Sequence, residues 1–282
     1  MPRPPPLDLG GLSFDWSRPV VMGILNITPD SFSDGGTYAD VGAVVQRALE
    51  LVAHGAQILD VGGESTRPGA DPVDVATELA RVVPVVRALA NAKLPVALSI
   101  DTRKAAVADA ALAAGAVIVN DVTALTDAQM ASVAARHGAI VILMHMRGDP
   151  QTMQQGPIAY DDVVTTVRDY LAAAMGRALS AGIARERIWL DPGIGFGKDV
   201  THNLLLTKGL ATLALLGQPV VYGPSRKRFL GAITGRDVGD RDAATAAACA
   251  AAILYGAHVL RVHDAEATRD AIAIATAVRD AS

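Results

Sequence analysis

The stretch PVVMGILNITPDSFSDGG, residues 19–36, begins as an apolar run that ends at Asn26 and continues as a loop of polar and turn-forming residues. The first part predicts a buried β-strand, because short apolar runs bounded by turn residues are typical of strands covered on both faces. A second stretch, ILDVGGESTRPGAD at residues 58–71, repeats the order of apolar run, acid, paired glycines and polar loop. Turn chemistry explains the Gly, Pro, Asp and Ser of one such loop but not the repetition. The repetition predicts strands that deliver functional side chains to one edge of a sheet.

Further apolar runs, each followed by a segment of helical period, continue this pattern to the end of the chain. We predict strands at residues 20–26, 57–62, 96–101, 117–122, 139–145, 188–192, 220–224 and 259–264. Helices are predicted at residues 40–54, 73–91, 104–114, 127–137, 160–181, 200–216, 240–256 and 265–281. Eight such βα units predict an α/β protein with a single (β/α)8 TIM barrel. A doubly wound sheet is the alternative, but the glycine-rich fingerprint that usually follows its first strand is absent.

The domain organisation follows from the length and the even composition of the chain. A chain of 282 residues suits one barrel or two smaller domains, and no linker or shift in composition divides it. We therefore assign residues 19–282 to the barrel and residues 1–18 to an N-terminal extension. Within the extension, LDLGGLSFDWS at residues 7–17 predicts a short hairpin over the barrel floor.

Charge and cysteine content narrow the possible partners and compartment. The net charge of −4 argues against a nucleic-acid partner and requires a local Lys and Arg cluster for any anionic substrate. The single cysteine, Cys249, is most simply a packed thiol in a reducing cytosol. Residues 243–260 contain no Asp, Glu, Lys or Arg, but they are mostly alanine, which predicts a buried helix running into a strand. We expect a cytoplasmic protein with no membrane partner.

Polar residues fall at the carboxyl end of every predicted strand, where barrels carry their chemistry. These residues are Asn26, Asp60, Asp101, Asn120, His145, Asp191, Ser225 with Lys227, and Arg261 with His263. Capping of the following helices is the plain alternative, and it accounts for residues such as Asp127. It does not account for Asp60, Asp101 and Asn120, which lie within apolar runs, since burying such groups is costly unless they are paired. The pattern favours a functional site.

The types of these side chains indicate the ligand. Asp101, Asn120 and Asp191 offer hydrogen-bond acceptors suited to a flat heterocycle, and Lys227 can donate to a ring carbonyl. Met144 and Phe196 are placed to cover the faces of such a ring.

The last two strands provide the cationic side chains. Arg261 and His263 share one strand face at the end of the barrel that commonly binds phosphate. An inward salt bridge by one of them is the alternative, but two together favour an anion.

Two other kinds of site are not supported. PGIGFGK at residues 192–198 is similar to a phosphate-binding P-loop, but Pro192 replaces its first glycine and Asp199 replaces the required Ser or Thr. No His and Cys spacing supports a zinc site.

Eight motifs in sequence resemble the dihydropteroate synthase family of folate biosynthesis, from about Pro19 to the end of the chain. They are MGILNITPDSFSDGG, DVGGESTRPGA, SIDT, NDV, LMHMRGDPQTMQ, LDPGIGFGK, GPSRKRFLG and RVHD. The chain departs from the family pattern at Tyr222 and Pro224 beside the SRK core, and at Arg147 and Asp149 in the fifth loop. These departures bear on the fit of substrate or inhibitor, not on the class of reaction.

The resemblance implies an enzyme that joins 6-hydroxymethyl-7,8-dihydropterin diphosphate to 4-aminobenzoate, releasing diphosphate in the presence of Mg²⁺. The pterin would contact Asp101, Asn120, Met144, Asp191, Phe196 and Lys227. The diphosphate would contact Asn26, Arg261 and His263, with Asn26 also near Mg²⁺. The 4-aminobenzoate would contact Phe32, Thr66, Arg67, Pro68 and Ser225. Asp101, Lys227 and Arg261 would carry the catalytic roles.

The resemblance also implies that the loops at residues 25–36 and 64–71 close over the site, and that the chain forms a homodimer. Two other readings stay open at this point. A pterin-binding methyltransferase domain shares the Asp and Asn contacts but has no need of STRPGA or SRK. A non-catalytic pterin-binding paralogue is expected to lose residues such as Arg67 or Lys227, which this chain retains.

Overall fold

Eight parallel strands form a closed barrel in the computed structural model, which describes residues 3–9, 11–27, 41–66 and 69–281. The strands are β3 (Val20–Asn26), β4 (Ile58–Gly62), β5 (Ala97–Asp101), β6 (Ile118–Asp121), β7 (Ile140–Met144), β8 (Ile188–Asp191), β9 (Val221–Tyr222) and β10 (Val259–Val262). Neighbours in the order β8-β7-β6-β5-β4-β3-β10-β9 are hydrogen-bonded. A parallel bridge between Leu190 and Val220 joins the two ends of this order, with Leu190 N donating to Pro219 O at 2.9 Å. The predicted TIM barrel is confirmed.

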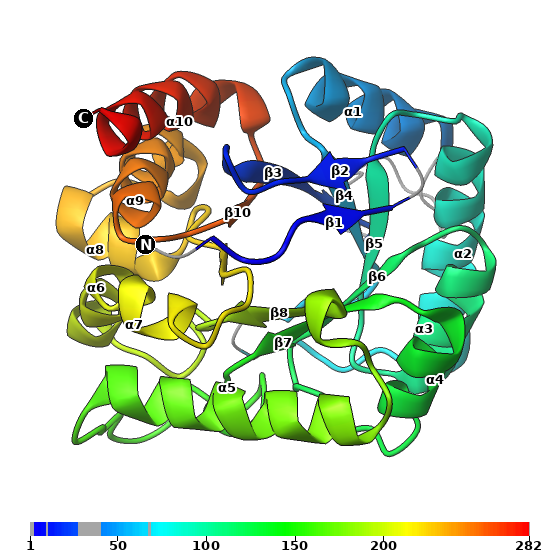
Figure 1. The fold of residues 1–282 in the computed structure, drawn as a ribbon, viewed down its shortest axis with the longest axis horizontal. Helices are drawn as coiled ribbons and strands as arrows, with labels where there is room; N and C mark the ends of the chain where they lie inside the picture. Colours follow the sequence, from blue (N-terminus) through cyan, green and yellow to red (C-terminus); the bar gives the residue numbers. More distant parts are fainter. Residues whose placement is uncertain (1–2, 10, 28–40, 67–68, 282) are drawn as a thin grey trace.

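The helices surround the barrel, as Figure 1 shows. They are α1 (Val41–Ala53), α2 (Val75–Asn91), α3 (Ala105–Ala113), α4 (Met130–His137), α5 (Val163–Ser180), α6 (Val200–Lys208), α7 (Leu210–Ala214), α8 (Arg228–Thr234), α9 (Asp242–Leu254) and α10 (Ala265–Asp280). Short 3₁₀ helices span Arg185–Arg187 and Val238–Asp240. In α1 the buried residues Val44, Ala48 and Leu51 recur at helical spacing, so that one apolar stripe faces the sheet. Aspartates cap four of the helices: Asp74, Asp162, Asp199 and Asp264.

The predicted segments differ from the structure in the last third of the chain. The helix predicted at 200–216 is two helices that meet at Gly209, where a Cβ would lie only 2.7 Å from Val164 Cγ2 on α5. The strand predicted at 220–224 is shorter in the structure, where β9 ends at Tyr222. Gly223 and Pro224 follow it, and proline has no N–H to donate to a strand ladder. The short helix α8 was not predicted. Barrels often insert such an extra helix beside the last strands.

The N-terminal extension covers the floor of the barrel. Strands β1 (Leu7–Asp8) and β2 (Ser13–Phe14) pair antiparallel, which confirms the predicted hairpin. Trp16 packs edge-on against Trp189 of β8 with ring centroids 5.4 Å apart, and its Nε1 donates to Pro5 O at 2.8 Å. The hairpin lies across one end of the barrel in Figure 1. Its apolar residues pack against Val20 and Val259, which begin their strands, so the amino ends of the strands are closed to solvent.

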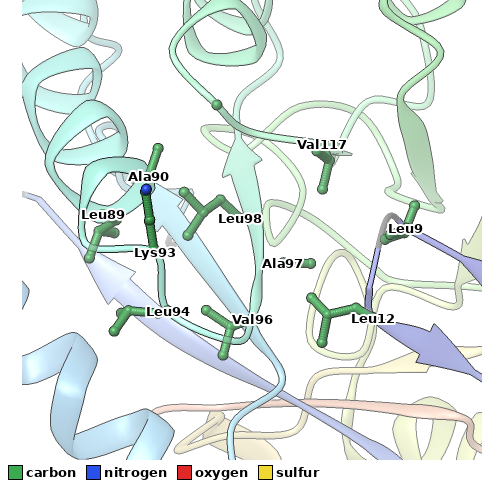
Figure 2. Close-up of a pocket in the computed structure, with 11 residues that line it drawn as sticks. Leu9, Leu12, Leu89, Ala90, Lys93, Leu94, Val96, Ala97, Leu98 and Val117 are labelled. Carbon is green, nitrogen blue, oxygen red and sulfur yellow. The ribbon is translucent and has the colours of Figure 1, made fainter.

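A pocket remains at the floor between this hairpin and the end of α2 (Figure 2). Its walls are the side chains of Leu9 and Leu12 from the hairpin, Leu94 and Val96 after α2, and Val117 before β6. Binding sites combine apolar walls with a few converging polar groups. Among the described side chains that line this pocket, that of Lys93 is the single polar one. The chemistry therefore has to be sought at the opposite end of the barrel.

The alanine-rich segment before the last strand forms helix α9 and then enters β10, as predicted. Cys249 is buried on this helix, and burial raises the pKa of its thiol to about 12, so the thiol stays protonated and unreactive. Among the residues that the structure describes, no helix is both long and apolar enough to cross a membrane.

Candidate active site

A polar pocket lies at the carboxyl ends of the strands, opposite the hairpin. The residues that line it come from the ends or following loops of seven strands, β4 to β10: Thr66, Asp101, Asn120, Val122, Met144, Asp191, Phe196, Gly223, Lys227 and Arg261. All six residues predicted to contact a pterin are therefore brought to one place. Parallel register explains part of this convergence, since Asp101 is directly opposite Asn120 on the neighbouring strand.

Asp60 is the buried centre of the polar network beneath this pocket. Its Oδ1 accepts from Ser99 Oγ at 2.6 Å, and its Oδ2 accepts from Asn120 Nδ2 at 3.0 Å and from Arg261 Nε at 2.6 Å. Ser99 is its register partner on β5. An ionised carboxylate only accepts, so Asp60 must face the amide nitrogen of Asn120, which leaves the amide oxygen to accept from a ligand. The sequence pointed to Asp60 as a strand-end acid but did not reveal this role.

Arg261 joins the two acids of neighbouring strands. Its Nη2 donates to Asp101 Oδ2 at 2.7 Å, in addition to the bond from Nε to Asp60. Burial acts to lower the pKa of Arg261, but Asp60 and Asp101 outweigh burial and raise it, so the guanidinium stays charged. The inward salt bridge considered above is thus present at Arg261. No described residue accepts from its Nη1, which remains able to bind an anion.

Asp191 and Lys227 form the other charged wall of the pocket. Burial raises the pKa of Asp191, whereas Lys227 opposes this shift, and Asp191 Oδ1 accepts from Gly193 N at 2.6 Å. Lys227 Nζ donates to Ile194 O and lies 4.5 Å from the centroid of the Phe196 ring. Burial lowers the pKa of Lys227 to about 8, although Asp191 acts to raise it. Val122, Met144, Met146 and Met153 pack with Phe196 as the apolar wall.

The two shifted groups predict a bell-shaped dependence of kcat/KM on pH. Burial also raises the pKa of Asp101 to about 7, against the opposing effect of Arg261. Below about pH 7 Asp101 gains a proton, and above about pH 8 Lys227 loses one, so both are charged only in the interval between. We expect the kcat/KM of the reaction at this site to be highest there and to fall on both sides when it is measured across pH. A flat profile between about pH 6 and about pH 9 would contradict the assignment of both groups.

The remaining predicted residues lie around this pocket. Ser225 Oγ bonds His263 Nδ1 at 2.9 Å and accepts from His263 N at 3.1 Å, so the residues predicted for 4-aminobenzoate and for diphosphate are adjacent. Asn26 ends β3, half-buried; a Cβ placed on Gly62 would lie 3.7 Å from both Asn26 Oδ1 and Asp101 Oδ2. Both oxygens therefore lie near Gly62, at ordinary contact distance from where its side chain would be. Phe32, Arg67 and Pro68, also predicted for 4-aminobenzoate, lie outside the described residues.

The turn that carries Ser225 and Lys227 is held by α9. Arg226, between them, has a φ of 56°, which is unusual for a residue with a side chain. Its Nε and Nη2 donate to the two oxygens of Asp242 at 2.8 and 2.9 Å, and its N donates to Thr245 Oγ1 at 3.1 Å. These bonds fix the strained backbone and hence the directions of the side chains on either side.

The fold and this pocket together define a barrel protein with a polar site suited to a flat, hydrogen-bonding heterocycle beside an anion. A family model described as "Pterin binding enzyme" matches residues 22–263. The chain is 45% identical to dihydropteroate synthase of Synechocystis sp. over 278 residues, covering 98% of this chain and 96% of the relative.

Solved structures agree. The Yersinia pestis dihydropteroate synthase with a sulfonamide drug has a TM-score of 0.92 at 43% identity, covering 98% of this chain and 100% of that one. The Xanthomonas albilineans dihydropteroate synthase with 4-aminobenzoic acid has a TM-score of 0.90 at 46% identity, covering 99% and 100%. The chain belongs to the dihydropteroate synthase family of pterin-binding enzymes.

Proposed function

We propose that this chain condenses 6-hydroxymethyl-7,8-dihydropterin diphosphate with 4-aminobenzoate to give 7,8-dihydropteroate and diphosphate. The observation that carries the proposal is the convergence of Asp101, Asn120, Asp191 and Lys227 with Arg261 around one pocket. The family membership supports it over nearly the whole chain, and the Xanthomonas albilineans relative holds 4-aminobenzoic acid.

The pocket suits the edges and faces of a pterin. The carboxylates of Asp101 and Asp191 and the amide oxygen of Asn120 accept from the N–H groups of the ring, because Asp60 already holds the amide nitrogen. Lys227 donates to the ring carbonyl. Met144 and Phe196 cover the ring faces with polarizable and aromatic surface.

The chemistry follows from the charges placed around this ring. The C–O bond of the pterin methylene breaks first, and its electron pair leaves with diphosphate. The resulting cation is delocalised over the dihydropterin, where Asp101 stabilises it. Arg261, His263 and Asn26 bind the departing diphosphate. The neutral amine of 4-aminobenzoate then forms the C–N bond and releases a proton to solvent, so no protein nucleophile is required.

The 4-aminobenzoate is held beside the pterin by residues of three loops. Thr66 lines the pocket, and Ser225 lies next to it through its bonds to His263. Phe32, Arg67 and Pro68 complete the proposed contacts. Closure of their loops would exclude water, which otherwise competes with the amine for the cation.

The residues present fit a Mg²⁺ ion that arrives with the substrate. Within the described part of the chain, no group of three or more His, Cys, Asp or Glu residues could hold a metal alone. Mg²⁺ commonly keeps several waters and takes its other ligands from one or two protein oxygens and substrate phosphates. The amide oxygen of Asn26, beside the Asp101 carboxylate, supplies such a protein oxygen. When bound, the ion supplies positive charge that stabilises the diphosphate leaving group.

One experiment separates this function from the two alternatives. The purified protein is incubated with the pterin diphosphate, 4-aminobenzoate and Mg²⁺, and both released diphosphate and product mass are measured. Equal amounts of diphosphate and a product of the mass of 7,8-dihydropteroate are expected. A methyltransferase domain or a non-catalytic paralogue would bind the pterin but yield neither product.

We further propose that the protein forms a homodimer through the face made by α8, α9 and α10, which lie together in Figure 1. These helices expose large apolar side chains, among them Ile233 at 55%, Ile274 at 67% and Val278 at 59% exposure. A second copy would remove this surface from water. Sedimentation of the wild type should give the mass of two chains, and Ile233→Glu with Ile274→Glu should give one. A wild type that sediments as one chain at all concentrations tested would contradict the dimer.

The protein is proposed to work in the cytoplasm. The buried, protonated thiol of Cys249 supports this location, since it needs no disulfide partner.

A further inference from the structure

The loop after β8, residues 192–198, has every one of its central carbonyl groups bonded to a side chain. Lys198 Nζ donates to Gly193 O at 2.9 Å and to Phe196 O at 3.0 Å. Gln154 Nε2 donates to Gly195 O at 2.8 Å, and Tyr160 Oη donates to Gly197 O at 2.9 Å. Lys227 Nζ donates to Ile194 O. A surface loop would leave most of these oxygens to water, so this loop is held as a rigid body.

Lys198 is the most buried of these donors. Only 3% of the residue is exposed, and its other contacts are His145 Nδ1 at 2.9 Å and His145 O at 3.2 Å. No described carboxylate lies within hydrogen-bond distance of its Nζ. Burial lowers the pKa of Lys198 well below its usual value, and burial together with Lys198 lowers that of His145 to about 3. Placing an amine here is costly, and the structure offers no gain from it except the fixed loop.

The three alternate glycines of the loop show how closely it is packed. Gly193, Gly195 and Gly197 all have positive φ, between 67° and 81°. A Cβ on Gly193 would lie 1.9 Å from His145 O, and one on Gly195 would lie 2.9 Å from Lys227 Cδ. The main chain of the loop therefore contacts the end of β7 and the side chain of Lys227 directly, with no side chain between them.

This loop carries groups of the active site. Phe196 lines the pterin pocket, and Ile194 O accepts a hydrogen bond from the ammonium group of Lys227. A shift of the loop would move both groups at once.

We propose that Lys198 is a positioning residue for pterin binding, with Gln154 acting on the same loop from the β7 side. It clamps the carbonyls of Gly193 and Phe196 so that the ring of Phe196 and the ammonium of Lys227 are fixed before the pterin arrives. The inference rests on the proposed function, because it assigns the pocket to a pterin. In this role Lys198 does not need to contact the substrate.

The test is Lys198→Met, which keeps the length of the side chain and removes its donors. We expect the Kd of 6-hydroxymethylpterin, measured by calorimetry, to rise about tenfold or more, as loss of one or two hydrogen bonds would give. The KM for 4-aminobenzoate should change less than about twofold, because the residues proposed to contact it all lie outside the loop at 192–198. Lys208→Met on the exposed end of α6 is the matched control and should change neither. Equal changes in both constants, or none, would overturn the proposal.

Gln154→Leu keeps the test decisive if Lys198→Met does not fold. It removes the donor to Gly195 O from outside the buried cradle, and we expect the pterin Kd to rise about three- to tenfold with the melting temperature nearly unchanged. An unchanged Kd in a folded Gln154→Leu protein would overturn the inference. A wild type that binds no pterin would instead overturn the proposed function, so the two failures are distinguishable.

Discussion

Replacing Asp101 by asparagine is expected to reduce turnover by at least about 10²-fold while the barrel stays folded. The asparagine oxygen can still accept from Arg261 Nη2, so the fold keeps this hydrogen bond. The amide has no charge with which to stabilise a cationic pterin, and preorganised charge of this kind is typically worth that factor. Lys227→Ala should cause a loss of similar size, because it removes both the donor to the ring and the contact with Phe196.

Steady-state rates of dihydropteroate formation check both variants, with circular dichroism to confirm the fold. Asp161→Asn, at an exposed position before α5, and Lys208→Ala are the matched controls, and both should keep wild-type turnover. A folded Asp101→Asn or Lys227→Ala enzyme with near-wild-type turnover would remove that residue from the mechanism.

Asp60→Leu is expected to destabilise the protein by about 3–5 kcal/mol, as the loss of one partner from a buried ion pair typically does. The leucine leaves three donors without their acceptor: Ser99 Oγ, Asn120 Nδ2 and Arg261 Nε. Urea unfolding of the variant and the wild type measures the difference. A change under about 1 kcal/mol would mean that the network contributes little to stability.

Asp60→Asn separates the charge of Asp60 from its hydrogen bonds. The amide oxygen can keep the bonds of Asn120 and Arg261, and the Ser99 hydroxyl can turn to accept from the new amide N–H. The negative charge of Asp60 helps to raise the pKa of Asp101. Its removal should therefore lower that pKa and move the acidic limb of the pH profile below about 7, with a smaller loss of stability than in Asp60→Leu. An acidic limb that does not move would show that Asp60 and Asp101 are not coupled.

The fold could be predicted because its signals are local. Apolar runs such as VVMGILN at residues 20–26 specify a strand buried on both faces, and the glycines and aspartates between runs specify where helices begin and end. Prediction was wrong where a distant segment decided the outcome. Gly209 divides the helix predicted at 200–216 because its backbone approaches Val164 of α5, which no pattern near Gly209 reports.

The residues of the site could be named from the sequence, but their partners could not. Because parallel strands in a barrel bring their carboxyl ends to one rim, polar residues at those ends had to gather there. The pairing of Arg261 with Asp60 and Asp101 spans 201 and 160 residues of chain. Only the closure of the barrel places β10 beside β3, so that Arg261 can reach the acids of β4 and β5.

The amino-acid sequence by itself determined the barrel, the rim at which the polar side chains gather and the identity of those side chains, because periodicity and strand polarity are properties of short segments. Only the tertiary structure decided how those side chains are oriented and charged. The direction of the Asn120 amide, the raised pKa of Asp101 and the clamp of Lys198 on the β8 loop all depend on burial and on partners from distant strands. Desolvation and hydrogen bonding act over a few ångströms in space, whatever the separation along the chain.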